Sequence, residues 1–328
     1  MVDSPEVQAI VARGKITAED ILKLRNRVFS KGVVTPNDAE MVFHLNDRID
    51  NIDNPSWSIF FVETLTDYVV MQAEPQGYIS DENAEWLIAR ISHSGHVDNE
   101  NELEVLVKAL ERARQSPVGL VKFALEQVKH GVLNGSGVVG HKHRLEPGVV
   151  GEGEVELLRR ILFAFGGDGN MAITKQEAEI LFDINDATSE VDNHPAWSDL
   201  FVKAIANFLM ASVGYRVPNR HEALRREAWL DSPSAGVGGF MSRMLAGSLD
   251  AVWDAYQNGS RDSGAKASSG LTNGDEPRAT AEEIRWVADR MGSDGQLHAN
   301  EMALIDFLKG HCAHLHPKLS PVLDRAAA

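Results

Sequence analysis

A short segment near the C-terminus concentrates residues that could bind a transition metal. Residues 311–317 contain three histidines and the only cysteine of the chain, namely His311, Cys312, His314 and His316. Imidazole nitrogens and thiolates are good ligands for zinc, nickel and copper. On a helix, Cys312 and His316 would share one face and His311 and His314 another, so one face supplies two ligands. The alternative is a polar helix end whose histidines interact favourably with the helix dipole.

Common catalytic motifs are absent from the sequence. There is no H-E-x-x-H, no G-x-x-x-x-G-K-[ST] and no G-x-S-x-G. The sequence therefore lacks the motifs that are typical of a zinc peptidase, a P-loop enzyme and a serine hydrolase. Residues 167–172 fit G-x-G-x-x-A, which binds a pyrophosphate when it joins a strand to a helix. Apolar residues with helical spacing precede this motif, so we predict no dinucleotide site. We expect no enzymatic activity and assign no catalytic residue.

Five segments share one pattern: a helix, a glycine-containing loop, a single apolar residue, a polar N-cap and an acidic first helical turn. They centre on Gly32, Gly77, Gly95, residues 168–173 and Gly295. Glycine permits a positive φ at a sharp turn. Four hydroxyl residues can accept hydrogen bonds from the free N–H groups of the following helix, and these are Thr35, Ser80, Thr174 and Thr280. The pattern predicts helix pairs joined by tight loops.

This pattern resembles the EF-hand superfamily, in which paired helix-loop-helix units meet through the apolar loop residue in a two-stranded ladder. The resemblance implies oxygen ligands at fixed places of the loop. The matching residues are Asp168, Asn170 and Glu177 in one loop and Asp294 and Glu301 in another. None of the five loops has an acid at the first place. Loops that only pair helices are therefore our first interpretation, and a calcium sensor or buffer is the alternative.

The chain contains an internal repeat. Residues 34–43 match residues 173–182 at an offset of 139, and the segment around Trp57 recurs around Trp197. Beyond Tyr78 the offset becomes 200, which matches Trp86 with Trp286. The change in offset indicates that roughly 63 residues are inserted in the second copy. Aromatic residues at helical spacing predict core positions in both copies, and they are Trp57, Phe61, Trp197 and Phe201.

The predicted fold is all-α, with two tandem EF-hand-like lobes. The first lobe covers residues 1–133, a glycine-rich linker covers 134–153, and the second lobe covers 154–328. The insert occupies about 216–278 of the second lobe. Its last part, residues 258–278, has little apolar content, and we expect it to be disordered.

The amino-acid composition narrows the classes of partner that the protein could bind and the compartments in which it could work. The formal net charge of −16 has the wrong sign for binding nucleic acid or an anionic membrane surface. A single cysteine excludes an internal disulfide framework, and no stretch has about 20 consecutive apolar residues, the length of a membrane span. With no recognisable signal peptide either, we expect a cytoplasmic protein.

Partner binding is the predicted function. The helical part of the insert carries apolar residues at three- and four-residue steps, and the candidates for a contact surface are Phe240, Met241, Met244, Leu245 and Trp253. Packing of these residues on the second lobe is the alternative. We expect a non-enzymatic interaction or regulatory scaffold with a protein partner and no cofactor. Calcium binding by the loops and transition-metal binding by the C-terminal cluster are the two alternative functions. The sequence identifies neither the partner nor the oligomeric state.

Overall fold

A computed structural model describes residues 4–49, 54–92, 95–97, 99–135, 147–164, 172–212, 278–293, 295–311 and 316–324. These residues form helices and connecting loops without a β-strand, so the predicted all-α fold is confirmed. No helix in the described ranges is both long enough and apolar enough to cross a membrane.

The chain divides into two compact units, one of Met1–Gly169 with Glu190–His194 and one of Asn170–Ser189 with Pro195–Ala328. The α-helices of the first unit are α1 (Pro5–Arg13), α2 (Ala18–Val28), α3 (Pro36–Arg48), α4 (Pro55–Asp67), α5 (Asp81–Ile91), α6 (Glu100–Arg112), α7 (Val118–Asn134) and α8 (Glu152–Leu162). Those of the second are α9 (Lys175–Ala187), α10 (Pro195–Ser212), α14 (Arg278–Arg290), α15 (Ala299–His311) and α16 (His316–Leu323). A 3-10 turn, η1 (Phe29–Lys31), follows α2, and a π-turn, η2 (Tyr68–Gln72), extends α4.

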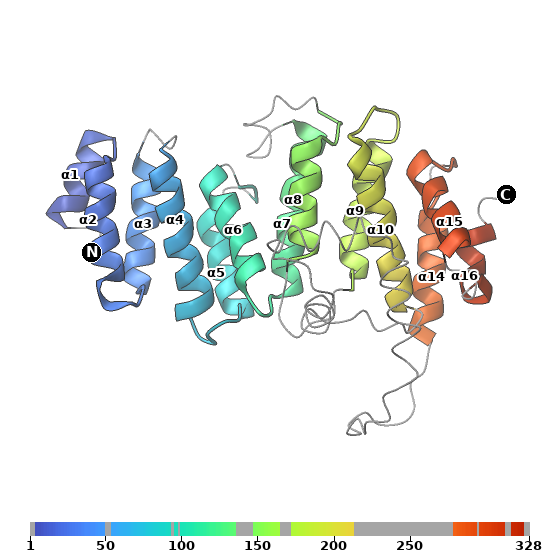
Figure 1. Cartoon of the computed structure of the whole chain (residues 1–328), viewed down its shortest axis with the longest axis horizontal. Coiled ribbons are helices and arrows are strands. Elements are labelled where there is room, and N and C mark those ends of the chain that lie inside the picture. The colour runs from blue at the N-terminus through green and yellow to red at the C-terminus, as the bar shows by residue number, and fades with distance from the viewer. Residues whose placement is uncertain are drawn as a thin grey trace, which may run out of the picture. The chain divides into compact units, whose positions relative to one another are not determined.

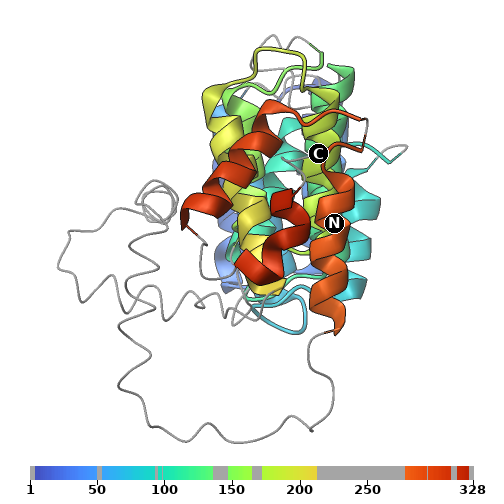
Figure 2. The ribbon, with the colours of Figure 1, turned by 90° about the vertical axis from the view of Figure 1, so that its right-hand side faces the viewer.

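Helices two apart in the chain pack side by side in the first unit. Successive contacts link α2 to α4, α4 to α6 and α6 to α8, while α1 packs on α3 and α5 on α7. Neighbours in sequence also pair, as α3 does with α4 and α7 with α8. The first unit therefore has one layer of even-numbered helices and one of odd-numbered helices (Figures 1 and 2). In the second unit, α10 contacts α9, α14 and α15, and α16 contacts α14 and α15.

Local sequence signals set most helix starts. The Thr35 and Thr174 side chains accept from the backbone of the third helical residue, and the carboxylates of Asp38 and Glu177 bind back in capping boxes. Ser80 likewise accepts from Asn83 N at 3.1 Å, so three of the four predicted caps are confirmed. The prediction for Thr280 is wrong, because α14 begins at Arg278 and includes this residue in its first turn.

In the EF-hand-like arrangement that the sequence resembles, the apolar residue of one loop pairs with that of another loop. Two backbone groups of the loop before α5 have other partners. The N–H of Ile79 donates to Gln115 O at 3.0 Å, and Gly77 O accepts from Arg114 N at 2.8 Å. Gly77 has a φ of +83°, a conformation that favours glycine. The loop before α5 is thus bonded to the segment that follows α6.

Matched aromatic clusters form the core of each unit. Trp57, Phe61, Trp197 and Phe201 are all buried, which confirms the predicted core positions. Phe43 meets Phe61 edge to face at 5.6 Å between ring centroids, and Phe182 meets Phe201 in the same way at 5.3 Å.

Two arginines, one in each unit, make corresponding contacts with an aromatic ring and a carboxylate. The Arg90 guanidinium lies 4.8 Å from the ring centroid of Phe43 and 3.3 Å from the Glu40 carboxylate. In the second unit, Arg290 lies 5.4 Å from the ring of Phe182 and 3.3 Å from the Glu179 carboxylate. Each arginine therefore lies over a phenylalanine ring of the core and pairs with a glutamate carboxylate on another helix.

Candidate functional site

Most of the residues singled out in the sequence lie outside the described ranges. These are Asp168, Asn170 and Asp294 of the candidate calcium loops, Cys312 and His314 of the C-terminal cluster, and Phe240, Met241, Met244, Leu245 and Trp253 of the insert. His311 ends α15 and His316 begins α16, so these two histidines belong to different helices. The contact surface predicted in the insert and the complete C-terminal cluster stay predictions.

Glu177 and Glu301, the described carboxylates of the candidate calcium loops, accept hydrogen bonds from backbone N–H groups of the loops before their own helices. Glu177 Oε2 accepts from Thr174 N at 2.6 Å. The two oxygens of Glu301 accept from Gly292 N at 3.1 Å and His298 N at 2.9 Å. Burial raises the pKa of both carboxyls above the ordinary value, although these hydrogen bonds oppose the shift.

Calcium affinity rises with the number and charge of oxygen ligands. The oxygens of Glu177 and Glu301 already accept backbone hydrogen bonds, and burial disfavours the charged form of each carboxyl. Within the described part of the chain, no group of three or more histidine, cysteine, aspartate or glutamate side chains is arranged to hold a metal ion. These contacts favour a capping role for Glu177 and Glu301.

A groove lined by apolar and charged residues crosses α4, α6 and α8 of the first unit. Its volume is about 920 Å³, and we call it the α4–α6–α8 groove. Ile59 and Val62 come from α4, Leu103 from α6 and Leu157 from α8. The side chain of Ile59 is 62% exposed, a high value for a large aliphatic residue inside a groove.

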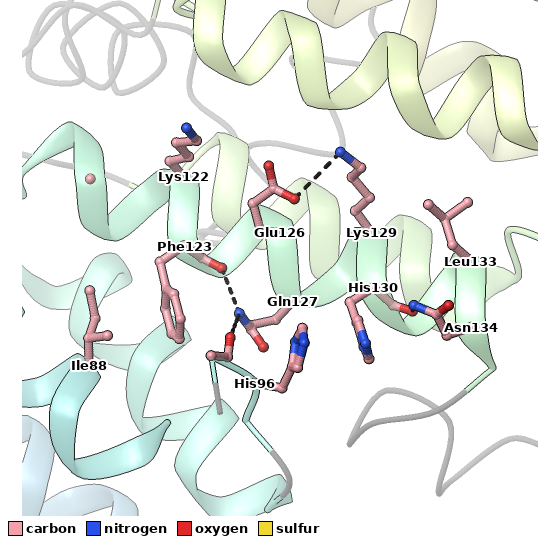
Figure 3. Close-up of a pocket in the computed structure, with 12 residues that line it drawn as sticks. Ile88, His96, Lys122, Phe123, Glu126, Gln127, Lys129, His130, Leu133 and Asn134 are labelled. Carbon is pink, nitrogen blue, oxygen red and sulfur yellow. Dashed lines mark hydrogen bonds and ion pairs between the residues drawn. The ribbon is translucent and has the colours of Figure 1, made fainter. Parts of the chain in front are cut away.

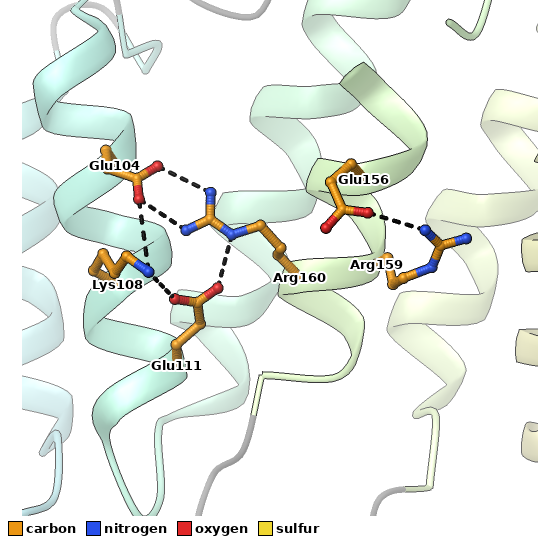
Figure 4. A network of polar contacts seen from close by, with 6 residues as sticks. All are labelled: Glu104, Lys108, Glu111, Glu156, Arg159 and Arg160. Carbon is orange, nitrogen blue, oxygen red and sulfur yellow. Dashed lines mark hydrogen bonds and ion pairs between the residues drawn. The ribbon is translucent and has the colours of Figure 1, made fainter. Parts of the chain in front are cut away.

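Charged side chains border this groove and tie α8 to α6 (Figure 4). The guanidinium of Arg160 donates to both carboxylate oxygens of Glu104, at 3.0 and 2.9 Å, and to Glu111 Oε1 at 2.7 Å. Lys108 Nζ donates to Glu111 Oε2 at 2.8 Å. This geometry fixes one end of the groove with a planar, doubly paired arginine.

The network shifts the pKa values of its members in opposite directions. Partial burial alone would raise the pKa of Glu111, but hydrogen bonds from Arg160 and Lys108 outweigh burial and hold it below the ordinary value. Burial would lower the pKa of Arg160, but its bonds to Glu104 and Glu111 outweigh that effect and raise it. Both groups are therefore charged at neutral pH.

A second pocket, of about 500 Å³, lies beside α7 in the same unit and contains two histidines (Figure 3). The rings of His96 and His130 stack with centroids 3.7 Å apart and an interplanar angle of 29°. Nδ1 of His96 is buried and has no hydrogen-bond partner among the described residues. We call this the His96–His130 pocket. The sequence interpretation missed it, although five of the twelve histidines fall between residues 93 and 143.

Comparisons of this chain with protein-family models, with curated proteins and with solved structures find no match. Its function is therefore inferred from its own residues.

Proposed function

We propose that this protein is a non-enzymatic interaction scaffold whose first unit binds a cationic amphipathic helix of a partner protein in the α4–α6–α8 groove. One observation carries the proposal: a largely exposed isoleucine, Ile59, lines a groove together with other apolar residues and five glutamates. Recognition of a helix in a groove uses apolar anchors at i, i+3 or i+4 and i+7.

The net charge of the groove favours a partner helix of opposite charge. Its lining includes five glutamates and three cations, so the formal charge is five negative minus three positive, or −2. The glutamates are Glu63, Glu100, Glu104, Glu111 and Glu156, and the cations are Lys108, Arg112 and Arg160. The whole chain carries −16. Both charges favour a partner helix that carries lysines or arginines beside its apolar face.

The apolar residues that line the groove would supply the apolar part of the binding energy. Complete burial of an aliphatic side chain contributes about 1.5–3 kcal/mol relative to exposure. Since Ile59 is 62% exposed, covering it would contribute about 1–2 kcal/mol on the same scale. One anchor of this size changes an affinity by roughly tenfold.

We further propose that the two sequence copies, residues 1–133 and 154–328, arose by duplication, and the matched contacts of Arg90 with Arg290 and of the aromatic clusters support this. The groove is not among the matched features. At the offset of 140 that aligns Trp57 with Trp197, Ile59 corresponds to Asp199. We therefore assign helix binding to the first unit.

The test uses a designed peptide of about five helical turns, with leucines at i, i+3, i+4 and i+7 and lysines on the other face. Fluorescence anisotropy measures its binding to the full chain. We expect Ile59→Asp to weaken binding at least tenfold. Leu22→Asp on α2 is the matched control, because Leu22 is 60% exposed and lies outside the groove lining. Equal effects of the two substitutions, or equal binding of a peptide with glutamates in place of lysines, would refute the proposal.

A further inference from the structure

We infer that His96 and His130 form a binding site for a divalent transition metal such as Zn²⁺ in the first unit, independent of the groove. Neutral imidazole is the protein ligand common to zinc, nickel and copper sites. The two rings come from different parts of the chain, His96 from the loop after α5 and His130 from α7. A pair brought together by tertiary packing is arranged before any ligand arrives.

Gln127 holds the two histidines in place. Its side chain is buried, and its Oε1 accepts from Val97 N at 3.0 Å while its Nε2 donates to Gly95 O at 3.4 Å. These bonds attach the residues on both sides of His96 to α7, one turn before His130 (Figure 3). Gly95, with φ of +88°, supplies the turn that brings the loop to the helix. Ligands positioned in this way lose less freedom when a metal binds.

Binding of one metal ion by both histidines requires a rearrangement of the stacked rings. Two nitrogens bound to zinc at about 2.0–2.1 Å with a tetrahedral angle lie about 3.3 Å apart. In that geometry the ring centroids would lie about 5 Å apart, because each centroid lies beyond its nitrogen as seen from the metal. The ring centroids of His96 and His130 are 3.7 Å apart, so the two stacked rings must splay apart to share one ion. A buried ring nitrogen without a hydrogen-bond partner among the described residues, as at Nδ1 of His96, is destabilising, and coordination through this nitrogen would remove that penalty.

The surrounding charges permit a cation. Lys122 and Lys129 line the same pocket, but both side chains point away from the two rings (Figure 3). Oε2 of Glu126 lies 3.5 Å from Nζ of Lys129, so this carboxylate offsets the charge of the lysine. The described residues offer no third histidine, cysteine or carboxylate at the pair, so water would complete the coordination there. His93, His141 and His143 are nearby in sequence but outside the described ranges, and His96 and His130 alone carry the assignment.

The test is a Zn²⁺ titration by calorimetry on the chelator-treated full chain. The C-terminal cluster is silenced first with His311→Gln, Cys312→Ser, His314→Gln and His316→Gln. In this background we expect His96→Gln and His130→Gln each to abolish binding of one molar equivalent of Zn²⁺. His44→Gln on α3 is the matched control, because His44 lies outside the pocket, and it should bind as the background does.

Two further measurements keep the inference falsifiable if a substitution unfolds the chain. Circular dichroism first verifies that each variant keeps its helical content. X-ray absorption on the Zn²⁺-loaded background protein should then show at least two imidazole nitrogens at about 2.0–2.1 Å. Unchanged Zn²⁺ binding in a folded His96→Gln/His130→Gln double variant would overturn the assignment. Absorption data without imidazole ligands would overturn it as well.

Discussion

Replacing Arg160 should destabilise the packing of α8 on α6 far more than replacing its neighbour Arg159. Arg160 reaches across from α8 to two carboxylates of α6, Glu104 and Glu111. Among the described residues, Arg159 pairs with Glu156 alone, which lies within its own helix. The two arginine side chains are equally accessible, at 24% and 25% exposure, so they form a matched pair. Substitution to Met keeps most of the aliphatic stem and removes the charge.

The expected difference follows from the number and geometry of the contacts. A partly exposed ion pair contributes about 0.2–1 kcal/mol, and bidentate arginine pairs lie at the upper end of that range. Arg160 makes three bonds of 3.0 Å or less to two carboxylates, which gives about 2 kcal/mol for Arg160→Met. A single pair three residues apart on a helix contributes about 0.3 kcal/mol, the value expected for Arg159→Met.

Hydrogen exchange of the α8 amides, followed by mass spectrometry across a urea series, measures this local stability. The loss in Arg160→Met should exceed that in Arg159→Met by more than 1 kcal/mol at 0.1 M salt. This difference between the two variants should shrink at 1 M salt, where the screening length falls from about 10 Å to about 3 Å. Equal losses in the two variants, or a gap that salt does not change, would show that the Arg160 network does not hold α8 on α6.

Three further outcomes are expected. Trp57 Nε1 donates to Asn46 Oδ1 at 3.1 Å, whereas Trp197 Nε1 has no partner among the described residues, so Trp57→Phe should cost about 1 kcal/mol more than Trp197→Phe in urea unfolding. The lowered pKa of Glu111 contributes stability above its unfolded value of 4.5, so the deficit of Glu111→Gln at pH 7 should disappear as pH falls through the folded pKa. Burial raises the pKa of Glu177, so wild-type stability should fall relative to that of Glu177→Gln as pH rises from 4.5 through the folded pKa.

Local features of the fold were predictable from sequence because short-range chemistry decides them. A threonine three residues before an acid specifies a helix start at Thr35 and Thr174, and helical spacing places Trp57 and Trp197 in the core. The same reasoning failed at Thr280, where the helix starts two residues earlier. Which loops meet is a different question. The bond from Ile79 to Gln115 depends on how whole helices pack, and no local pattern encodes that.

The candidate sites were harder to predict for the same reason. Sequence reasoning favours ligands that are close together along the chain, such as the C-terminal histidines. His96 and His130 are 34 residues apart and meet through tertiary packing, with Gln127 of α7 bonded to the residues on both sides of His96. The α4–α6–α8 groove draws on three helices. For Glu177 a usable signal did exist, since T-x-x-E is a capping box, and the structure has Glu177 in that role.

Under the proposed duplication, the core contacts of the two copies match while the proposed binding residues differ. Core contacts recur, because replacing an aromatic residue or its covering arginine leaves a cavity or an unpaired charge that both units must avoid. The proposed binding residues do not recur: Ile59 corresponds to Asp199, and His96 corresponds to Gln296. Neither difference is needed to keep a helix folded, since both first-unit residues lie at least partly open to solvent. The proposed specialisation of the first copy for ligands would account for both differences, since the shared core contacts require neither an exposed isoleucine nor a stacked histidine pair.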